Sequence, residues 1–158
     1  MSNSSISLSI SEKSPSTTPP TILVTATNLH QSTSLTLLTW DTPFDEKALF
    51  LGIFHFTDTS TNEALSTASL KLNRVLPPSP EFFQEIGPRR AITKEIVLDG
   101  PGAKLQNGKE YDVQVKGRWK AVWHASVLDI GDENLKKMGG GTGVKTWDFE
   151  SEVLRIKA

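Results

Sequence analysis

Basic and aromatic side chains alternate in one short segment of the chain, from residue 116 to residue 124. Its two tryptophans stand four residues apart, and a histidine follows the second one. Exposed tryptophan beside arginine or lysine is typical of protein interfaces, and it also stacks on sugar rings or on the bases of single-stranded nucleic acid. The pattern predicts a binding surface made of five side chains: Arg118, Trp119, Lys120, Trp123 and His124.

The same segment also fits a structural interpretation, which we favour. Trp119 and Trp123 share the odd-numbered parity of Tyr111 and Val113. Because side chains of a strand alternate between its two faces, all four would point the same way. In this interpretation the tryptophans lie in the core, and the basic residues between positions 116 and 120 are solvated on the opposite face.

The histidines His30, His55 and His124 are the next candidates for chemistry. A zinc site needs three or four converging ligands, and these histidines lack the i, i+4 spacing that places two ligands on one helix face. We therefore expect structural histidines, and we predict no metal, no cofactor and no catalytic residue. The sequence also has no Gly-x-Ser-x-Gly element that would position a serine nucleophile, so we favour a protein that is not an enzyme.

Two loops carry patterns that are reminiscent of ligand sites. The acidic turn of Asp41, Asp45 and Glu46 lacks the Asp-x-Asp-x-Asp-Gly order of a calcium loop, so turn formation and helix capping explain it better. The glycine-rich run 139–143 precedes Lys145, but no helix pattern follows, as a phosphate-binding loop would require. We expect this run to be a mobile loop.

Composition and charge narrow the function classes. The chain has 17 Lys and Arg residues against 18 Asp and Glu, a net charge of −1, which gives no electrostatic reason to expect nucleic acid or a membrane surface. It has no cysteine, so disulfides and thiol chemistry are excluded. The first residues lack the basic and apolar regions of a signal peptide. We therefore expect a protein partner, no nucleic acid, no membrane, and a cytoplasmic rather than a secreted location.

The elements that must position these residues are short strands separated by turn signals. Apolar and polar residues alternate, or β-branched residues cluster, between turns that recur about every 8–12 residues. We expect segment 34–40 to pair antiparallel with the strand before it, and short helical turns near 47–50 and 132–138. The predicted strands cover 5–10, 21–27, 34–40, 52–58, 64–73, 91–98, 111–124 and 144–156.

The length of 158 residues is typical of one domain. We therefore predict a single domain over 1–158. Within it, 1–20 holds the first strand and a loop rich in proline and serine, and 125–146 forms a long loop with a short helix.

The clearest architectural signal surrounds the only tyrosine of the chain. Leu105, Gly108 and Tyr111 form a turn followed by a strand. In immunoglobulin-like sandwiches, a tyrosine placed in this way packs its ring in the core and bonds its hydroxyl to backbone just upstream. We therefore predict an all-β fold: an antiparallel immunoglobulin-like β-sandwich of eight or nine strands, with a tyrosine corner, one or two short helical turns, and the Tyr111 hydroxyl bonded to backbone within 105–107.

The order of several motifs resembles the N-terminal domain of fungal deuterolysin-like and peptidyl-lysine metalloendopeptidases. The resemblance spans residues 20–118, and its motifs are Thr27-Asn28, Leu37 to Phe44, Phe54 to Asp58, Phe82 to Ile86 and the corner at Tyr111. It implies a fungal, immunoglobulin-like domain that serves as a pro-segment or accessory domain. The chain lacks the His-Glu-x-x-His motif of the protease domain, so no catalytic residue carries over.

These observations predict a non-catalytic binding module that resembles a protease pro-segment and inhibits or chaperones a protease. Two alternatives stay open. One is a fungal effector or elicitor that acts on a host, which requires secretion. The other is a small-ligand-binding protein or enzyme, which requires a pocket with convergent polar groups between the sheets or under the loop 125–146.

Overall fold

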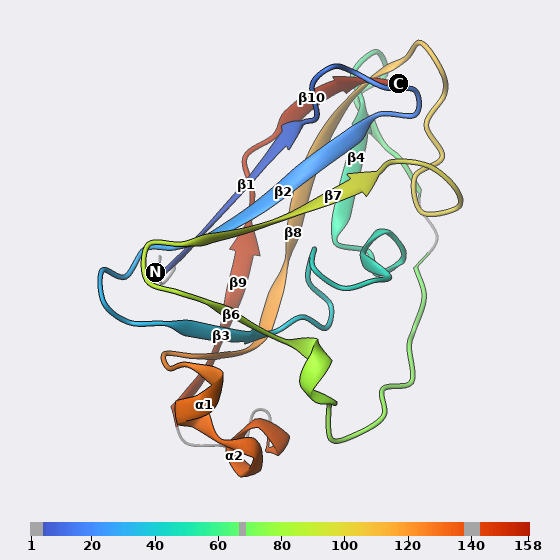
Figure 1. Cartoon of the computed structure of the whole chain (residues 1–158). Helices are drawn as coiled ribbons and strands as arrows, with labels where there is room; N and C mark the ends of the chain where they lie inside the picture. The colour runs from blue at the N-terminus through green and yellow to red at the C-terminus, as the bar shows by residue number, and fades with distance from the viewer. Residues whose placement is uncertain (1–4, 67–68, 138–142) are drawn as a thin grey trace.

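A computed structural model describes residues 5–66, 69–137 and 143–158, in which strands dominate (Figure 1). The elements in chain order are β1 (Ile6–Glu12), β2 (Thr21–Asn28), β3 (Leu35–Leu38), η1 (Ala48–Phe50), β4 (Phe54–Asp58), β5 (Glu63–Ala64), η2 (Pro80–Phe82), β6 (Phe83–Ile86), β7 (Ala91–Val97), β8 (Glu110–Trp123), α1 (Val127–Ile130), α2 (Asp132–Lys136), β9 (Val144–Glu150) and β10 (Leu154–Lys157).

The strands form two antiparallel sheets. The smaller sheet has the order β1-β2-β7. The larger sheet is built around the long strand β8, whose first half lies between β4 and β10 and whose second half lies between β3 and β9. β5 extends the sheet beyond β4, and β6 extends it beyond β3. The predicted antiparallel β-sandwich is confirmed, although the described residues form ten strands rather than eight or nine.

The predicted pairing of segment 34–40 with the strand before it is wrong. Both edges of β2 are occupied by β1 and β7, so β3 crosses to the other sheet and pairs with β6 and β8. The buried Asn28 fixes this crossing. Its side-chain Nδ2 donates to the backbone oxygens of Thr33 and Ile86, and its Oδ1 accepts from the backbone N–H of His30.

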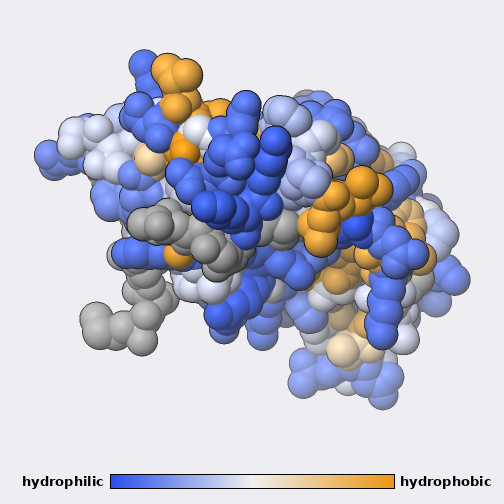
Figure 2. All heavy atoms as spheres, turned by 90° about the horizontal axis from the view of Figure 1, so that it is seen from below, coloured by the Kyte–Doolittle hydropathy of each residue, from blue (hydrophilic) through white to orange (hydrophobic). Residues whose placement is uncertain are grey.

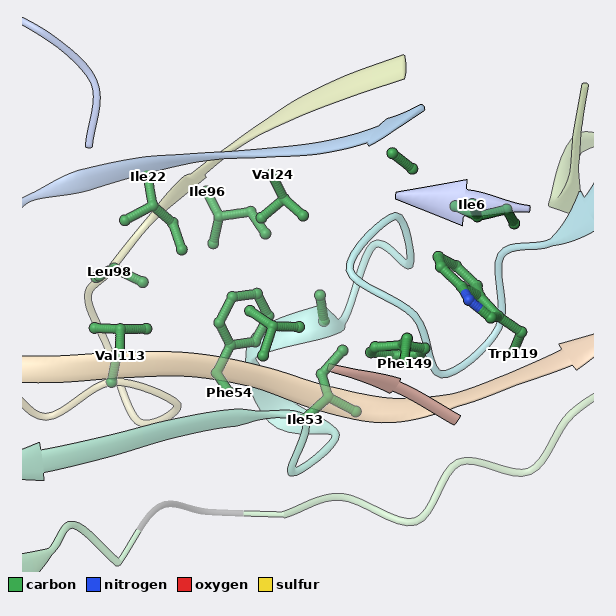
Figure 3. Close-up of a cluster of buried hydrophobic side chains, with 14 of the residues drawn as sticks. Ile6, Ile22, Val24, Ile53, Phe54, Ile96, Leu98, Val113, Trp119 and Phe149 are labelled. Carbon is green, nitrogen blue, oxygen red and sulfur yellow. The ribbon is translucent and has the colours of Figure 1, made fainter. Parts of the chain in front are cut away.

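Side chains from both sheets fill the space between them (Figure 3). Ile22 and Val24 of β2 and Val113 of β8 are completely buried. Each fully buried aliphatic side chain of this kind contributes about 1.5–3 kcal/mol through the hydrophobic effect. The rings of Trp119 and Phe149 pack with centroids 4.6 Å apart. The interior of the sandwich is therefore packed with side chains rather than hollowed for a ligand.

The tyrosine corner is confirmed. Tyr111 is 1% exposed, and its hydroxyl oxygen accepts the backbone N–H of Gln106 at 2.9 Å. Leu105 packs against the core. Gly108 has a φ of 86°, a conformation that favours glycine, and its N–H donates to the backbone oxygen of Ala158 at 2.6 Å. The corner thus ties the start of β8 to the end of the chain.

The helical elements are short, and within residues 5–66, 69–137 and 143–158 none is long and apolar enough to cross a membrane. η1 lies at the helical turn predicted near 47–50, and α2 at the one predicted near 132–138. The predicted return strand over 64–73 is mostly wrong, because only Glu63–Ala64 pairs with β4. Residues 139–142 of the predicted glycine loop lie outside the described residues.

Candidate functional site

A β-bulge divides the predicted binding residues between two faces of the larger sheet. The register of β8 against β9 shifts between Trp119 and Val122. Both of these side chains belong to the core between the sheets, whereas Ala121 and Trp123 belong to a second cluster. The prediction that Trp119 and Trp123 point to the same face is wrong, because the extra residue of the bulge reverses the alternation of side chains.

The second hydrophobic cluster lies on the outer face of the larger sheet, where segment 125–136 covers it. Trp123 is 2% exposed and packs its ring 5.7 Å from that of Phe83. Ile130 of α1 and Leu135 of α2 close the cluster from outside. Both tryptophans of the predicted surface are therefore buried, which agrees with the structural interpretation. They lie in two different cores, so they do not share one face as that interpretation expected.

The predicted basic residues lie in two separate surface contacts. Arg118 donates through Nη1 to Asp148 and through Nε to Thr146, each at 3.1 Å, so it belongs to the exposed edge at β9. Lys120 places its Nζ 2.9 Å from a carboxylate oxygen of Asp41. The five predicted residues do not form one continuous surface.

The contact of Lys120 leads to an ion-pair network around the acidic turn. The Arg74 Nη2 lies 3.0 Å from Asp41 Oδ1 and 2.7 Å from Asp45 Oδ2. The same guanidinium lies 5.0 Å above the ring of the buried Trp40. Asp45 is only 5% exposed, so Arg74 compensates a carboxylate that would otherwise be buried without a counter-charge.

Asp45 also has the turn-forming role that the sequence predicted for the acidic segment. Its carboxylate accepts the backbone N–H groups of Asp41 and Lys47 at 3.0 and 2.9 Å. Burial favours a raised pKa for Asp45, but these two N–H groups and the Arg74 charge outweigh burial and lower the pKa. Asp45 therefore stays ionised at neutral pH.

Lys94 of β7 fastens this turn to the smaller sheet. Its Nζ donates to the backbone oxygen of Asp45 at 2.8 Å. Burial lowers the pKa of Lys94, and the charges of Asp45 and Glu46 oppose that effect. The turn, Arg74 and β7 thus form one connected polar structure at the open side of the sandwich.

A cleft of about 660 Å³ lies beside this network. β6 and β7 are joined by a turn but belong to different sheets and diverge from one another (Figure 1). The cleft is lined by Gln84 of β6 and by Ile92, Thr93 and Lys94 of β7. Its wall combines apolar side chains with charges of both signs. The apolar residues include Phe44, Phe82 and Ile92, the cations are Lys47, Arg74 and Lys94, and the carboxylates are Asp45, Glu46 and Glu81. We treat this space, named the β6–β7 cleft below, as the candidate functional site.

The surface at the end of the molecule that carries α1 and α2 has a different character. Seen from below, it is mostly hydrophilic, and its hydrophobic residues lie in separate places (Figure 2). Leu128 of α1 is the most exposed large hydrophobic side chain in the described part of the chain, at 90%. We therefore place the candidate site in the β6–β7 cleft rather than on this end.

Two of the three histidines meet at another corner of the molecule. The rings of His30 and His124 lie edge to face with centroids 5.2 Å apart, while His55 is exposed on β4. Within the residues that the structure describes, no group of three or more His, Cys, Asp or Glu side chains is arranged to hold a metal ion.

The fold and its comparison with known families agree. A family model described as an immunoglobulin-like domain matches residues 6–158. The chain belongs to this immunoglobulin-like domain family. The match covers both sheets of the sandwich, including the tyrosine corner and the β6–β7 cleft.

This immunoglobulin-like domain is also similar to a protein of the fungus Arthroderma benhamiae that is described as an uncharacterised secreted protein. The two are 27% identical over 123 residues, which cover 77% of this chain and 62% of the relative. The chain thus spans less than two thirds of that relative's length. The similarity supports the fungal origin that the sequence resemblance implied.

The secreted relative contradicts the predicted cytoplasmic location. The prediction relied partly on the absence of cysteine, which is a poor guide for a domain of this size. A chain of 158 residues buries enough apolar surface to be stable without disulfides. The immunoglobulin-like domain illustrates this point with a core that spans both sheets.

Sequence reasoning missed most of the β6–β7 cleft. Arg74 stands in an irregular segment with no periodic pattern, and Lys94 reads as an ordinary polar position of a strand. One signal was present: the acidic turn of Asp41 and Asp45 is rich enough in negative charge to require a cation once the turn is buried. The sequence does not say which of the 17 basic residues supplies it.

Proposed function

We propose that this immunoglobulin-like domain is a non-catalytic binding module that acts outside the cell, and that the β6–β7 cleft receives a segment of a protein partner. The cleft is the main observation that supports this proposal. Its volume of about 660 Å³ and its mixture of apolar and charged walls are in the range typical of ligand sites, which supports the proposal. The similarity to a secreted fungal protein supports the extracellular setting.

The charges of the cleft favour recognition over catalysis. Arg74 is fixed by two carboxylates and the ring of Trp40, and Lys94 is fixed by the backbone oxygen of Asp45. Asp45 stays ionised, so it is unsuited to act as a general acid near neutral pH. Groups held in this way orient a ligand at low entropic cost, and they are not poised to transfer protons.

A segment that suits the cleft places an apolar side chain between Phe44 and Phe82 and an acidic group near Lys47. Lys47 is exposed at the rim, and no ion pair engages it among the described residues. The resemblance to deuterolysin-like N-terminal domains makes a secreted metalloprotease our first choice of partner. An effector role on a host protein would use the same cleft with a different partner.

The proposal is tested by capture of proteins from fungal culture medium on the immobilised domain. Lys47→Glu reverses the charge at the rim, and Gln84→Trp fills the cleft from β6; both positions are exposed, so the fold should be kept. Lys157→Glu on β10 makes the same charge change away from the cleft. We expect a protease to bind the wild type and the Lys157 variant, and to bind the two cleft variants at least about tenfold more weakly.

Two results would overturn parts of the proposal. Equal capture by the wild type and both cleft variants would show that the partner binds elsewhere. Capture of a partner that is not a protease, with loss of binding in the cleft variants, would keep the binding site and reject the pro-segment-like role.

A further inference from the structure

His30 and His124 form a pair that neither the β6–β7 cleft nor the core requires. His30 follows β2 in the crossing to β3, and His124 follows β8. Their rings lie edge to face, 5.2 Å apart, and the ring of Trp147 of β9 lies 6.4 Å from that of His124. The Nε2 of His30 and the Nδ1 of His124 are buried, and neither has a hydrogen-bond partner among the described residues.

The charged groups around the pair are mostly positive. Burial lowers the pKa of His124, and the charges of Lys145 on β9 and of the neighbouring His30 lower it further. Arg89, in the turn between β6 and β7, donates its backbone N–H to the backbone oxygen of His30 at 3.0 Å. Its guanidinium donates to the backbone oxygen of Leu29 at 3.3 Å, so a second cation lies on the His30 side.

The carboxylates on the neighbouring strands are already engaged. Glu85 of β6 accepts the backbone N–H of Val127 at 2.8 Å, at the start of α1. Asp148 of β9 is paired with Arg118. Protonation of both imidazoles therefore adds two positive charges beside Lys145 and Arg89, while Glu85 and Asp148 contact Val127 and Arg118.

We propose that His30 and His124 form an acid-activated oxyanion site, which binds a sulfate or phosphate group when both rings carry a proton. Each protonated ring donates through both nitrogens, and the edge-to-face arrangement directs these donors along different directions. These N–H donors suit a tetrahedral oxyanion better than a planar carboxylate, and the positive charge of Lys145, which acts on His124, adds to the attraction. The ring of Trp147 forms an apolar wall beside them.

Thermodynamic linkage makes the proposal quantitative. An oxyanion that binds only the doubly protonated pair must favour proton uptake by the pair, and acid must in turn tighten oxyanion binding. Sulfate is the suitable probe, because it keeps its charge of −2 between pH 5 and 8 whereas phosphate does not. Any change in sulfate affinity over that range then reports protonation of the protein.

The experiment follows the three histidine rings by NMR from pH 8.0 to 5.0, in chloride and in sulfate. We expect sulfate at pH 5.0 to shift the ring signals of His30 and His124 but not those of His55, which is exposed on β4 and serves as an internal control. Sulfate affinity measured by calorimetry should be at least about tenfold higher at pH 5.0 than at pH 7.5. His30→Gln and His124→Gln should lose this difference, and His55→Gln should keep it.

Lys145→Gln leaves both rings in place, so it tests the site even if a histidine variant fails to fold. It should weaken sulfate binding at pH 5.0. The proposal is overturned if sulfate shifts all three histidines equally, if its affinity does not depend on pH, or if the Lys145 and histidine variants bind as the wild type does. A parallel titration with a sulfated disaccharide and with inorganic phosphate shows whether the site selects the free ion or the group on a larger ligand.

Discussion

Removal of the Tyr111 hydroxyl isolates one hydrogen bond of the tyrosine corner. In Tyr111→Phe the ring remains in the core, so no cavity forms, and the change is limited to the bond that the hydroxyl accepts from Gln106 at 2.9 Å. A neutral hydrogen bond of this type contributes about 1 kcal/mol to the free energy of unfolding. Gln106 is exposed, so water can partly replace the lost acceptor and the loss should not exceed this value.

Urea denaturation of Tyr111→Phe should therefore show a loss of about 1 kcal/mol, and the unfolding temperature should fall by about 3 °C for a chain of this size. Tyr111→Ala also removes the ring and should lose about 3–5 kcal/mol. The difference between the two variants separates the hydroxyl from the ring.

Amide hydrogen exchange gives a residue-level control for the same variant. The N–H of Gln106 should exchange faster in Tyr111→Phe, whereas that of Gly108 should be unchanged because it donates to Ala158. The reasoning is refuted if the stability of Tyr111→Phe matches that of the wild type, if it falls as far as that of Tyr111→Ala, or if Gly108 loses protection together with Gln106.

Four further predictions test other parts of the structure. Gly117→Ala should lose about 1–3 kcal/mol of stability, because its Cβ would lie 2.6 Å from the Phe149 ring. Adding Phe149→Leu should recover part of this loss, so additive effects of the two changes in urea denaturation would contradict the contact. Arg74→Ala should lower the free energy of unfolding by about 2 kcal/mol, because it leaves the buried Asp45 without its cation. Arg118→Ala should lower it by less than about 0.5 kcal/mol, because the ion pair of Arg118 with Asp148 is exposed. Similar losses for the two variants would refute the assignment of Arg74 as the counter-charge of Asp45. In chloride buffer the free energy of unfolding should decrease as the pH falls below 6.5, because the pKa of His124 is lower in the folded chain, so that the unfolded chain gains the proton first. His124→Gln should flatten this pH dependence, and an unchanged slope would show that His124 is not its cause. The pKa of Asp58 should be about 2, because the hydroxyl and N–H of Ser60 and the ammonium of Lys109 stabilise its charged form. Its contribution to the free energy of unfolding is therefore complete above pH 3.8 and is lost as the pH falls towards 2. Ser60→Ala should raise this pKa in an NMR titration of the carboxyl carbon, and no rise would exclude the Ser60 bonds as its cause.

The sequence predicted the elements of the fold better than their pairing. Alternation predicts β1 and the first half of β8 correctly, because their side chains alternate between more and less buried positions, and the β-branched residues of segment 21–27 predict β2. Pairing of β3 depends on which edges of β2 are already occupied, and β7, which occupies one of them, lies far along the chain. Local patterns carry no information about that occupancy.

The site was harder to predict than the fold for two physical reasons. A bulge after Trp119 changes the face of every later side chain on β8, and a single inserted residue leaves no mark in the pattern of Ala121 to Trp123. The β6–β7 cleft is formed where the two sheets separate, so its residues come from a turn, an irregular segment and two edge strands. Such a space depends on tertiary structure throughout.

The central position of β8 has a consequence for the kinetics of folding. β3 and β4 are synthesised early, yet both hydrogen-bond to β8, which follows much later in the chain. Closing such long loops slows folding, and unpaired strand edges stay exposed until Glu110–Trp123 has emerged from the ribosome. The pairs β3–β6 and β4–β5 precede β8 in the chain and can form before it, but only β8 joins them into one sheet. A nascent chain that stops before Glu110 therefore holds two separate strand pairs without the partner that connects them.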